Sequence, residues 1–535
     1  MSFGNRIILP VLFSALALLA GCGGSSNNVT NPTPPPSGGF SNSNLNGTYV
    51  FSASGSDQAN GAPYALVGTL TANGSGAVTG GAIDMIDAAF SGPVTNVSVS
   101  GTYKIGVDGR TQASLAASTP FGQNLTLDFV LQDSSHGLVI EFDGNATGSG
   151  SLDLQTSGAT PTGSYAFLLS GAGLANSSVV PFVAVGNFAL GSNGTFAGLE
   201  DFNNNGFAYA NQTLNGVLAL GPSSSPATTM TTTQFGTQTF DVFAVDANHL
   251  KFIETDGTGT LTGDAFSQSS ASLSAATFAF TLQGSYPGAN SISSAGGFIA
   301  MDGAGNVTNT STIDVNNGGT VSQSPLAFSG TYAAAGTGRF TSTLNGFEGT
   351  QSQYAIYPFN GGLLLLEIDN LGIMAGAAYP QSAGATFSTS DGYGLNLSGG
   401  NTAQSSFVEV DDIAEFTGSA ITGVIDENFA PAGGPSYGLA LGTGSVSGPD
   451  ASGRWTLTAN AGNSSQSTLN GGFQLTFYAA DGTTFPFIET DANGQIASGV
   501  FLKQNAASAS SAAMKSHAFI MQPIPHPHAL ARKAR

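Results

Sequence analysis

Ile140-Glu141-Phe142-Asp143 recurs three times along the chain, as Ile253-Glu254-Thr255-Asp256, Leu366-Glu367-Ile368-Asp369 and Ile488-Glu489-Thr490-Asp491. The four glutamates are 113, 113 and 122 residues apart. A second pattern follows the same register, as Ile83-Asp84, Glu200-Asp201, Ile313-Asp314 and Ile425-Asp426. Solenoid and propeller repeats span only about 20 to 50 residues, whereas a period near 113 residues is the size of one small domain. The sequence therefore predicts four tandem domains.

The stretches between these markers have the pattern of β-hairpins. Short alternating runs rich in Val, Ile, Phe, Tyr and Thr are separated by Asn-Gly and Asp-Gly pairs, among them Asn73-Gly74, Asn193-Gly194, Asn345-Gly346 and Asp481-Gly482. Such pairs are strong hairpin signals, and no capped helical periodicity follows residue 40. In the first repeat we expect about eight strands joined by short turns. The fold prediction is all-β, with each repeat an eight-stranded antiparallel up-and-down barrel, which has no exposed edges, or alternatively a two-sheet β-sandwich.

The predicted domains occupy residues 45–156, 161–270, 275–382 and 385–505. The composition supports folded domains, because 41% of residues are hydrophobic, 36 are Phe and only 8% are charged. A chain this apolar is not generally disordered. Its single cysteine, Cys22, excludes internal disulfides and cysteine metal sites. We expect no cofactor and no metal centre.

The charge of the domains restricts the possible partners. All 32 acidic residues lie between Asp57 and Asp491, whereas residues 45–505 contain only six Lys or Arg, which gives a net charge of 6 minus 32, or −26. Such a surface repels phosphates, so nucleic acid is not an expected partner. Residues 506–535 have the opposite charge, with Lys515, Arg532, Lys533 and Arg535 and no acid. They are predicted to be a disordered basic tail.

The repeated glutamates are candidate buried acids. On a strand, Glu141 lies on the same face as Val139, and each of the other three glutamates has an apolar neighbour at the same spacing. A buried carboxylate needs a partner. We therefore predict structural ion pairs within each repeat, formed by Glu141 with Arg110, Glu254 with Lys251, Glu367 with Arg339 and Glu489 with Arg454. Two alternatives are a ligand-contacting carboxylate in a barrel mouth and an exposed acid at a sheet edge.

Two other groups of residues are weaker candidates for sites. Asp201, Asn203 and Asn205 match the first half of a calcium loop, but the twelfth position is Gln212 instead of a bidentate Glu, and turn formation explains the Asn residues equally well. His136 and His249 both lie five residues before the repeated Glu, a position that we interpret as a turn.

The N-terminus has the pattern of an export signal. Arg6 precedes an uncharged apolar run from Ile7 to Leu19, which is too short to span a bilayer as a helix. The run ends in Leu19-Ala20-Gly21-Cys22, which resembles the lipobox of bacterial lipoproteins. The resemblance implies cleavage of a signal peptide at residues 1–21, lipidation of Cys22 and a membrane anchor. Gly23 follows instead of Asp, which by the family's sorting rule favours the outer membrane. Residues 22–44 read as a flexible linker.

The sequence restricts the function of the protein less than it restricts its architecture. A nucleophile, a base and an orienting group do not occur together in any recognisable motif, so we expect no enzyme, and a hydrolase is the least favoured class. The favoured class is a lipid-anchored envelope protein whose non-catalytic domains have structural roles or bind an envelope polymer, a glycan or a protein multivalently. The alternative is a carrier of small apolar or sugar ligands with one cavity per barrel. The repeats resemble those of tandem β-domain lipoproteins, a resemblance that implies no particular activity.

Overall fold

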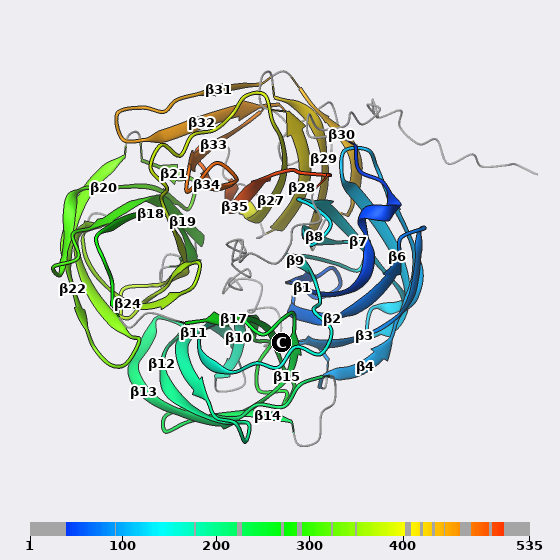
Figure 1. Cartoon of the computed structure of the whole chain (residues 1–535), viewed down its shortest axis with the longest axis horizontal. Coiled ribbons are helices and arrows are strands. Elements are labelled where there is room, and N and C mark those ends of the chain that lie inside the picture. Colours follow the sequence, from blue (N-terminus) through cyan, green and yellow to red (C-terminus); the bar gives the residue numbers. More distant parts are fainter. Residues whose placement is uncertain are drawn as a thin grey trace, which may run out of the picture.

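The computed structural model describes residues 39–507, except 91, 176–177, 222–226, 269–271, 286–291, 323–324, 348–349, 402–407, 418–420, 431–433, 443, 461–471 and 492–494. This part of the chain is all-β, with one short 3-10 helix, η1 (Asn42–Asn44). None of its helices is long and apolar enough to cross a membrane. Figure 1 shows the four β-domains arranged in a ring around a common axis.

Each domain contains one antiparallel sheet built from consecutive strands. The first consists of β1 (Asn46–Asp57), β2 (Pro63–Asn73), β3 (Ala77–Asp87), β4 (Val94–Ser98), β5 (Ser100–Ile105), β6 (Arg110–Thr119), β7 (Gly122–Leu131), β8 (His136–Phe142) and β9 (Ala146–Leu154). The second consists of β10 (Gly163–Ala175), β11 (Ser178–Leu190), β12 (Thr195–Asn204), β13 (Phe207–Val217), β14 (Thr228–Thr232), β15 (Gly236–Ala244), β16 (His249–Glu254) and β17 (Thr262–Ser267).

The other two domains follow the same plan. The third consists of β18 (Ala276–Ser285), β19 (Ile292–Met301), β20 (Asn306–Asn317), β21 (Thr320–Val321), β22 (Leu326–Ala334), β23 (Phe340–Phe347), β24 (Thr350–Phe359), β25 (Gly362–Glu367) and β26 (Ile373–Pro380). The fourth consists of β27 (Gly392–Asn401), β28 (Val408–Thr417), β29 (Thr422–Ala430), β30 (Ser436–Leu441), β31 (Ser445–Ser447), β32 (Arg454–Ala459), β33 (Phe473–Tyr478), β34 (Thr484–Glu489) and β35 (Gln495–Lys503).

The sheets close by pairing of their first strands with their last. β10 pairs with both β11 and β17, which makes the second domain a closed eight-stranded barrel. In the first and third domains, pairing of β2 with β3 and of β19 with β20 closes eight strands, and the short strands β4 and β21 are additional. In the fourth sheet β27 pairs with β35, and Gly442 N, just after β30, donates to Asn460 O, just after β32, at 2.5 Å. The predicted up-and-down barrel is thus confirmed in preference to the sandwich.

Most of the quoted Asn-Gly and Asp-Gly pairs connect strands, but one does not. Gly74 and Gly194 have φ of 74° and 82°, the left-handed conformation that tight hairpins need and that glycine adopts without strain. The pair Asn345-Gly346 instead lies inside β23, at a register shift against β24. Glycine at this position accommodates a β-bulge, with φ of 79°.

The barrel interiors are filled by side chains. In the second barrel, Phe167, Phe182, Phe188 and Phe252 belong to one buried cluster, and equivalent aromatic-rich clusters fill the other three barrels. Closely packed interiors of this kind are what apolar burial drives in small barrels. The fourth barrel contains a cavity of about 10 Å³, lined by Leu395, Phe416 and other apolar residues. That volume is at the lower limit for a single water molecule.

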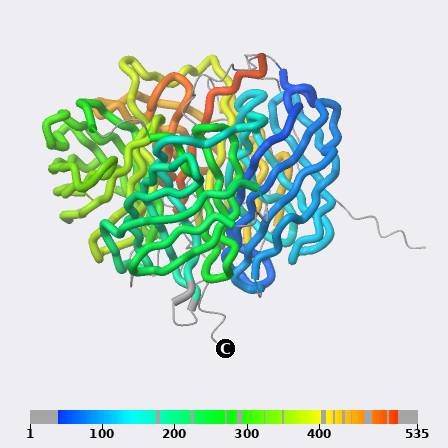
Figure 2. The backbone as a smooth tube through the Cα atoms, turned by 60° about the horizontal axis from the view of Figure 1, so that its bottom comes forward, coloured from blue at the N-terminus to red at the C-terminus, as the bar shows by residue number. Residues whose placement is uncertain are grey.

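The last two strands of each barrel are also buried on their outer face. In β8 all seven residues are buried, and in β25 all six. Outward residues of β8 such as Leu138 and Ile140 pack against Val500 and Leu502 of the fourth domain. Apolar clusters also join the first domain to the second and the second to the third. Figure 2 shows the neighbouring domains lying against one another along their strands, so the four barrels form one closed ring.

Candidate functional site

The arginines of the third and fourth domains are ion-paired across domain boundaries. Arg339 of the third domain binds Asp201 of the second domain through both carboxylate oxygens, at 2.6 Å from Nε and 2.5 Å from Nη2. The Tyr357 hydroxyl donates to the same carboxylate at 2.6 Å. Arg454 Nη1 of the fourth domain binds one carboxylate oxygen of Asp314 of the third domain at 2.6 Å, and the Tyr478 hydroxyl donates to the other at 2.7 Å. Charge-assisted contacts of this kind are stronger than neutral hydrogen bonds.

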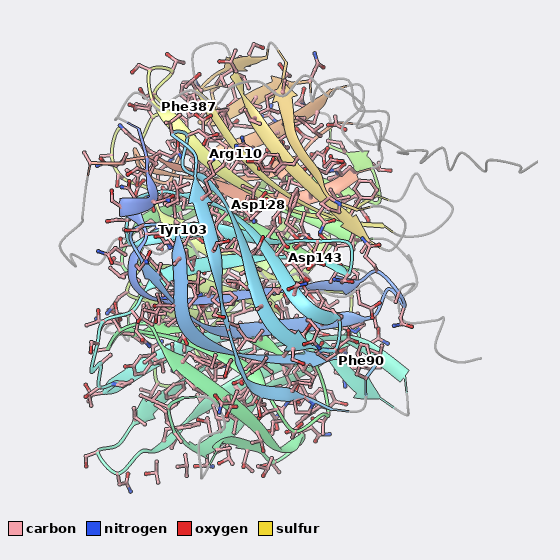
Figure 3. The ribbon with its side chains drawn as sticks, turned by 90° about the vertical axis from the view of Figure 1, so that its right-hand side faces the viewer. Phe90, Tyr103, Arg110, Asp128, Asp143 and Phe387 are labelled. Atoms are coloured by element: carbon pink, nitrogen blue, oxygen red, sulfur yellow. The ribbon has the colours of Figure 1, made fainter. Side chains whose placement is uncertain are left out.

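The boundary between the fourth and first domains closes the ring with a variant of this arrangement. Arg110 Nη1 lies 2.5 Å from Asp426 of the fourth domain, and Arg110 Nε lies 2.8 Å from Asp108. Burial raises the pKa of Asp128 well above its usual range, and the adjacent Asp426 raises it further. Figure 3 shows Arg110 and Asp128 where the first domain meets the fourth. Each arginine therefore joins its domain to the preceding domain of the ring.

These contacts correct the ion pairs predicted from sequence. The partners of Arg110, Arg339 and Arg454 are aspartates of the second repeated pattern, and the prediction that they pair with Glu141, Glu367 and Glu489 is wrong. The reason is strand alternation, which puts the arginines and glutamates on opposite faces. Phe340, next to Arg339, points into the barrel core, so Arg339 points outward, whereas Glu367 shares the inward face of Leu365.

The glutamates instead lie at one end of each barrel interior. Glu254 accepts hydrogen bonds from the Thr258 hydroxyl at 2.7 Å and from Leu261 N at 3.1 Å, and Glu367 accepts one from Met374 N at 3.1 Å. These bonds tie the strand to the hairpin that follows it. Burial raises the pKa of Glu254 to about 7, helped by the charge of Asp256. Lys251, its predicted partner, binds Asp264 and Asp153 instead.

The aspartate of the tetrapeptide has a structural role that explains its recurrence. Asp143, Asp256, Asp369 and Asp491 each accept a hydrogen bond from a backbone N–H of the preceding antiparallel strand, from Thr126, Thr239, Gln353 and Gln474 respectively. Three of them also accept from a backbone N–H two residues further on. The carboxylate satisfies donors at the end of the ladder that would otherwise be unpaired.

The boundary between the first two domains has a charged network that sequence reasoning missed. Lys251 Nζ lies 2.9 Å from Asp264 of its own domain and 3.2 Å from Asp153 of the first domain. His136 binds Asp153 and His249 binds Asp264, both at 2.6 Å. The two histidines begin β8 and β16, so their interpretation as turn residues is wrong. Burial would raise the pKa of Asp264, but Lys251 and His249 lower it. The sequence signal for this network is that His136 and His249 both lie five residues before the repeated Glu.

The boundary between the first and second domains lacks the inter-domain arginine that the other three boundaries have. The second repeat contains no Arg, and Asp84, the counterpart of Asp201, lies beside Asp241. Burial, helped by the adjacent Asp241 carboxyl, raises the pKa of Asp84 to about 7. We call this boundary the seam of the ring.

The calcium candidate is wrong in the structure. Asp201 binds Arg339 and Tyr357, and the Asn203 amide donates to backbone carbonyls of the third domain, Glu367 O at 3.2 Å and Gly372 O at 2.8 Å. A cationic partner and a donating amide leave these groups unable to serve as oxygen ligands. Asn205, with φ of 54°, occupies the turn between β12 and β13.

A pocket of about 520 Å³ lies toward the axis of the ring, and we call it the axial pocket. Three domains line it, and two of these, the first and the third, are opposite members of the ring. Its lining residues are Gln132, Asp133, Asn360, Gly361, Tyr379, Pro380, Ser382, Ala480, Asp481, Thr483, Thr484, Lys503 and Asn505. The turns before β8, β25 and β34 thus converge on one space, which sequence alone could not show.

The polar groups of the axial pocket are held in place by local contacts. Asp481 accepts hydrogen bonds from Thr483 and Thr484 N within its turn, at 2.7 and 2.8 Å. Lys503 Nζ lies 2.7 Å from Asp391, in a pair that is partly exposed. The amides of Gln132 and Asn505, together with the hydroxyls of Ser382 and Thr483, supply neutral donors and acceptors. The pocket is suited to a polar ligand of low charge.

Cys22 and residues 508–535 of the predicted basic tail lie outside the described residues.

The fold and the axial pocket define an all-β ring of four barrels with a pocket that three of them line. No family model and no curated protein matches the sequence. Among solved structures, it is similar to a double mutant of transferrin binding protein B from Haemophilus parasuis Hp5, with 9% identity, 75% of this chain and 82% of that chain covered, and a TM-score of 0.21. The chain is also similar to the isotype 1 transferrin binding protein B from serogroup B Neisseria meningitidis. That match has 10% identity, covers 69% of this chain and 84% of the other, and has a TM-score of 0.17. Similarity this low establishes no shared function.

Proposed function

We propose that the chain is exported, lipidated on Cys22 and anchored at the outer membrane as a non-catalytic binding platform. The observation that carries the proposal is the closed ring, in which buried ion pairs hold four barrels so that the turns of three of them converge on the axial pocket. A rigid ring presents these turns in a fixed arrangement, and preorganisation lowers the entropic cost of binding.

The proposed ligand is a segment of a polar envelope polymer, foremost a glycan. The axial pocket, at about 520 Å³, lies within the range of roughly 300 to 1,000 Å³ typical of small-ligand sites. Its side-chain amides and hydroxyls match the hydroxyl groups of sugars. A protein segment bound through its backbone is the competing occupant.

The filled barrels favour this proposal over a carrier with one ligand per barrel. The aromatic clusters occupy the barrel interiors, and the cavity of about 10 Å³ in the fourth barrel is too small for a ligand. The buried inter-domain contacts also favour one rigid unit over four independent modules on a flexible chain.

Binding is tested with soluble fragments of the native cell's envelope polysaccharides. Ser382 is exposed and lines the axial pocket, so Ser382→Trp should abolish glycan binding, measured by calorimetry, without lowering the Tm. Thr310→Trp, at an exposed position of β20, is the matched control and should bind normally. Equal binding by both variants would remove the axial pocket from the proposal.

The anchor is tested separately. The full-length chain should incorporate labelled palmitate and fractionate with outer membranes, and Cys22→Ala should do neither. Recovery of unlabelled, soluble wild-type protein would contradict the anchor without affecting the test of the axial pocket.

A further inference from the structure

Three of the four domain boundaries share an asparagine whose side chain is inserted into the neighbouring domain. The buried amides of Asn203, Asn316 and Asn428 each donate to backbone carbonyls at the hairpin that follows the repeated Glu. Asn203 donates to Glu367 O and Gly372 O, and Asn316 donates to Glu489 O and Gln495 O, both at 3.0 Å. Each of these boundaries therefore holds a carboxamide among two or three carbonyl acceptors.

The seam has no such amide, because Ile86 occupies the equivalent position. Ile86 lies two residues after Asp84, as Asn203 lies two residues after Asp201, and the strand registers agree. The isoleucine side chain packs in the apolar cluster of Phe243 and Ile253 and cannot donate a hydrogen bond.

A cavity of about 170 Å³ lies beside Ile86, and we call it the seam cavity. Its second-domain wall includes Gly257, Gly259 and Thr260. Gly259 follows Glu254 by five residues, as Gly372 follows Glu367. The cavity therefore lies against the hairpin that receives a side-chain amide at the other three boundaries.

The other walls of the seam cavity are mainly apolar. They include Ala88, Ala172 and Val179, and Phe90 at the rim is 44% exposed. Figure 3 shows Phe90 at the edge of the first domain that faces the second. Apolar walls with a carbonyl-bearing hairpin on one side suit a ligand with a short alkyl part and one hydrogen-bond donor.

We propose that the seam cavity is a binding site for a small neutral carboxamide. The ligand's N–H donates to the Gly259 carbonyl at this hairpin, and its alkyl part contacts Ile86, Val179 and Phe90. The chemistry is that of the Asn side chains at the three equivalent hairpins. A carboxylate of the same shape is rejected, because it has no donor to offer and the buried Asp87 lines the cavity. This site is separate from the axial pocket, and it does not depend on the proposed function.

The direct test compares propanamide with propanoate by ligand-observed NMR and thermal shift on the whole chain. We expect saturable binding and an increase in Tm with propanamide only. Val179→Phe fills the seam cavity while keeping Ile86, and it should weaken propanamide binding at least about tenfold, the effect of losing about 1.4 kcal/mol of contact. Absence of propanamide binding, equal binding of propanoate, or unchanged affinity in Val179→Phe would each overturn the proposal.

A matched variant extends the test to a boundary that has its own amide. Asn203→Ala should empty the equivalent position between the second and third domains and lower the Tm, and propanamide should restore part of that loss. Ile86→Asn should supply the amide at the seam and remove propanamide binding. If propanamide fails to restore Asn203→Ala while propanoate restores it, the assigned chemistry is wrong.

Discussion

Replacement of Arg339 by Met tests whether inter-domain ion pairs hold the ring together. Asp201 is fully buried, and its carboxylate is held by Arg339 and the Tyr357 hydroxyl. Removing one partner of a buried pair leaves an uncompensated charge and costs about 3 to 5 kcal/mol. For a cooperative unit of two domains, each kcal/mol corresponds to about 2 to 4 °C. Arg339→Met should therefore lower the Tm by about 6 to 20 °C.

The assay is calorimetric unfolding at pH 7 of the wild type and three variants. Lys104→Met, at an exposed position of β5, is the control and should change stability by less than about 0.5 kcal/mol. The double variant Arg339→Met with Asp201→Asn removes the orphaned charge and should recover part of the loss. A Tm equal to that of Lys104→Met, or no recovery in the double variant, would refute the reasoning.

Three further outcomes test other features of the ring. Burial raises the pKa of Glu200 to about 8 and the pKa of Asp84 to about 7, so the folded state retains protons that the unfolded chain releases near pH 4. The free energy of unfolding should therefore be greatest below about pH 4 and fall as the pH rises to about 8. A Tm that rises between these two pH values would contradict the assignment. Asn428→Ala removes three hydrogen bonds to first-domain carbonyls and should speed hydrogen exchange in β9, whereas unchanged exchange would mean that other contacts close the ring. Tyr478→Phe removes a donor to a buried carboxylate and should cost about 1.5 to 3 kcal/mol, followed by the fluorescence of Trp455; an unaltered transition would make the hydroxyl dispensable.

The seam distinguishes the ring from a symmetric assembly of four equal domains. Three boundaries combine an Asp–Arg pair with an inserted Asn, whereas the seam has the Asp84 and Asp241 carboxyls, the Lys251 network and Ile86.

Much of the fold was predictable because it depends on local patterns. Strand alternation and turns such as Asn73-Gly74 act over a few residues, and the period of the Glu-x-Asp marker counts the domains directly. The strands that carry this marker also contain a sequence pattern that indicates burial on both faces. Leu363 to Leu366 is a continuous apolar run without alternation, which is typical of a strand buried on both faces and indicates an outer covering.

The candidate sites were predictable only in part. Sequence indicated that Arg339 and its counterparts neutralise buried acids, and strand parity alone separated the inward Glu367 from the outward Asp201. Pairing across a boundary also requires knowledge of which faces meet, and that depends on packing. The axial pocket is less accessible still, because Asp133 and Asp481 are 348 residues apart in the chain.

The sequence by itself determined the all-β class, four domains of similar length and the residue types available for charge neutralisation, whereas it left the closed barrel and the two-sheet sandwich as alternatives. Only the tertiary structure decided that the barrels form a closed ring, that Arg110 meets Asp426, and that turns from three domains surround one pocket. The physical reason is the distance along the chain over which the deciding interactions act. Turn conformation and strand alternation are set by neighbouring residues, whereas ring closure is set by the outer surfaces of four barrels packing together, and no single repeat contains that information.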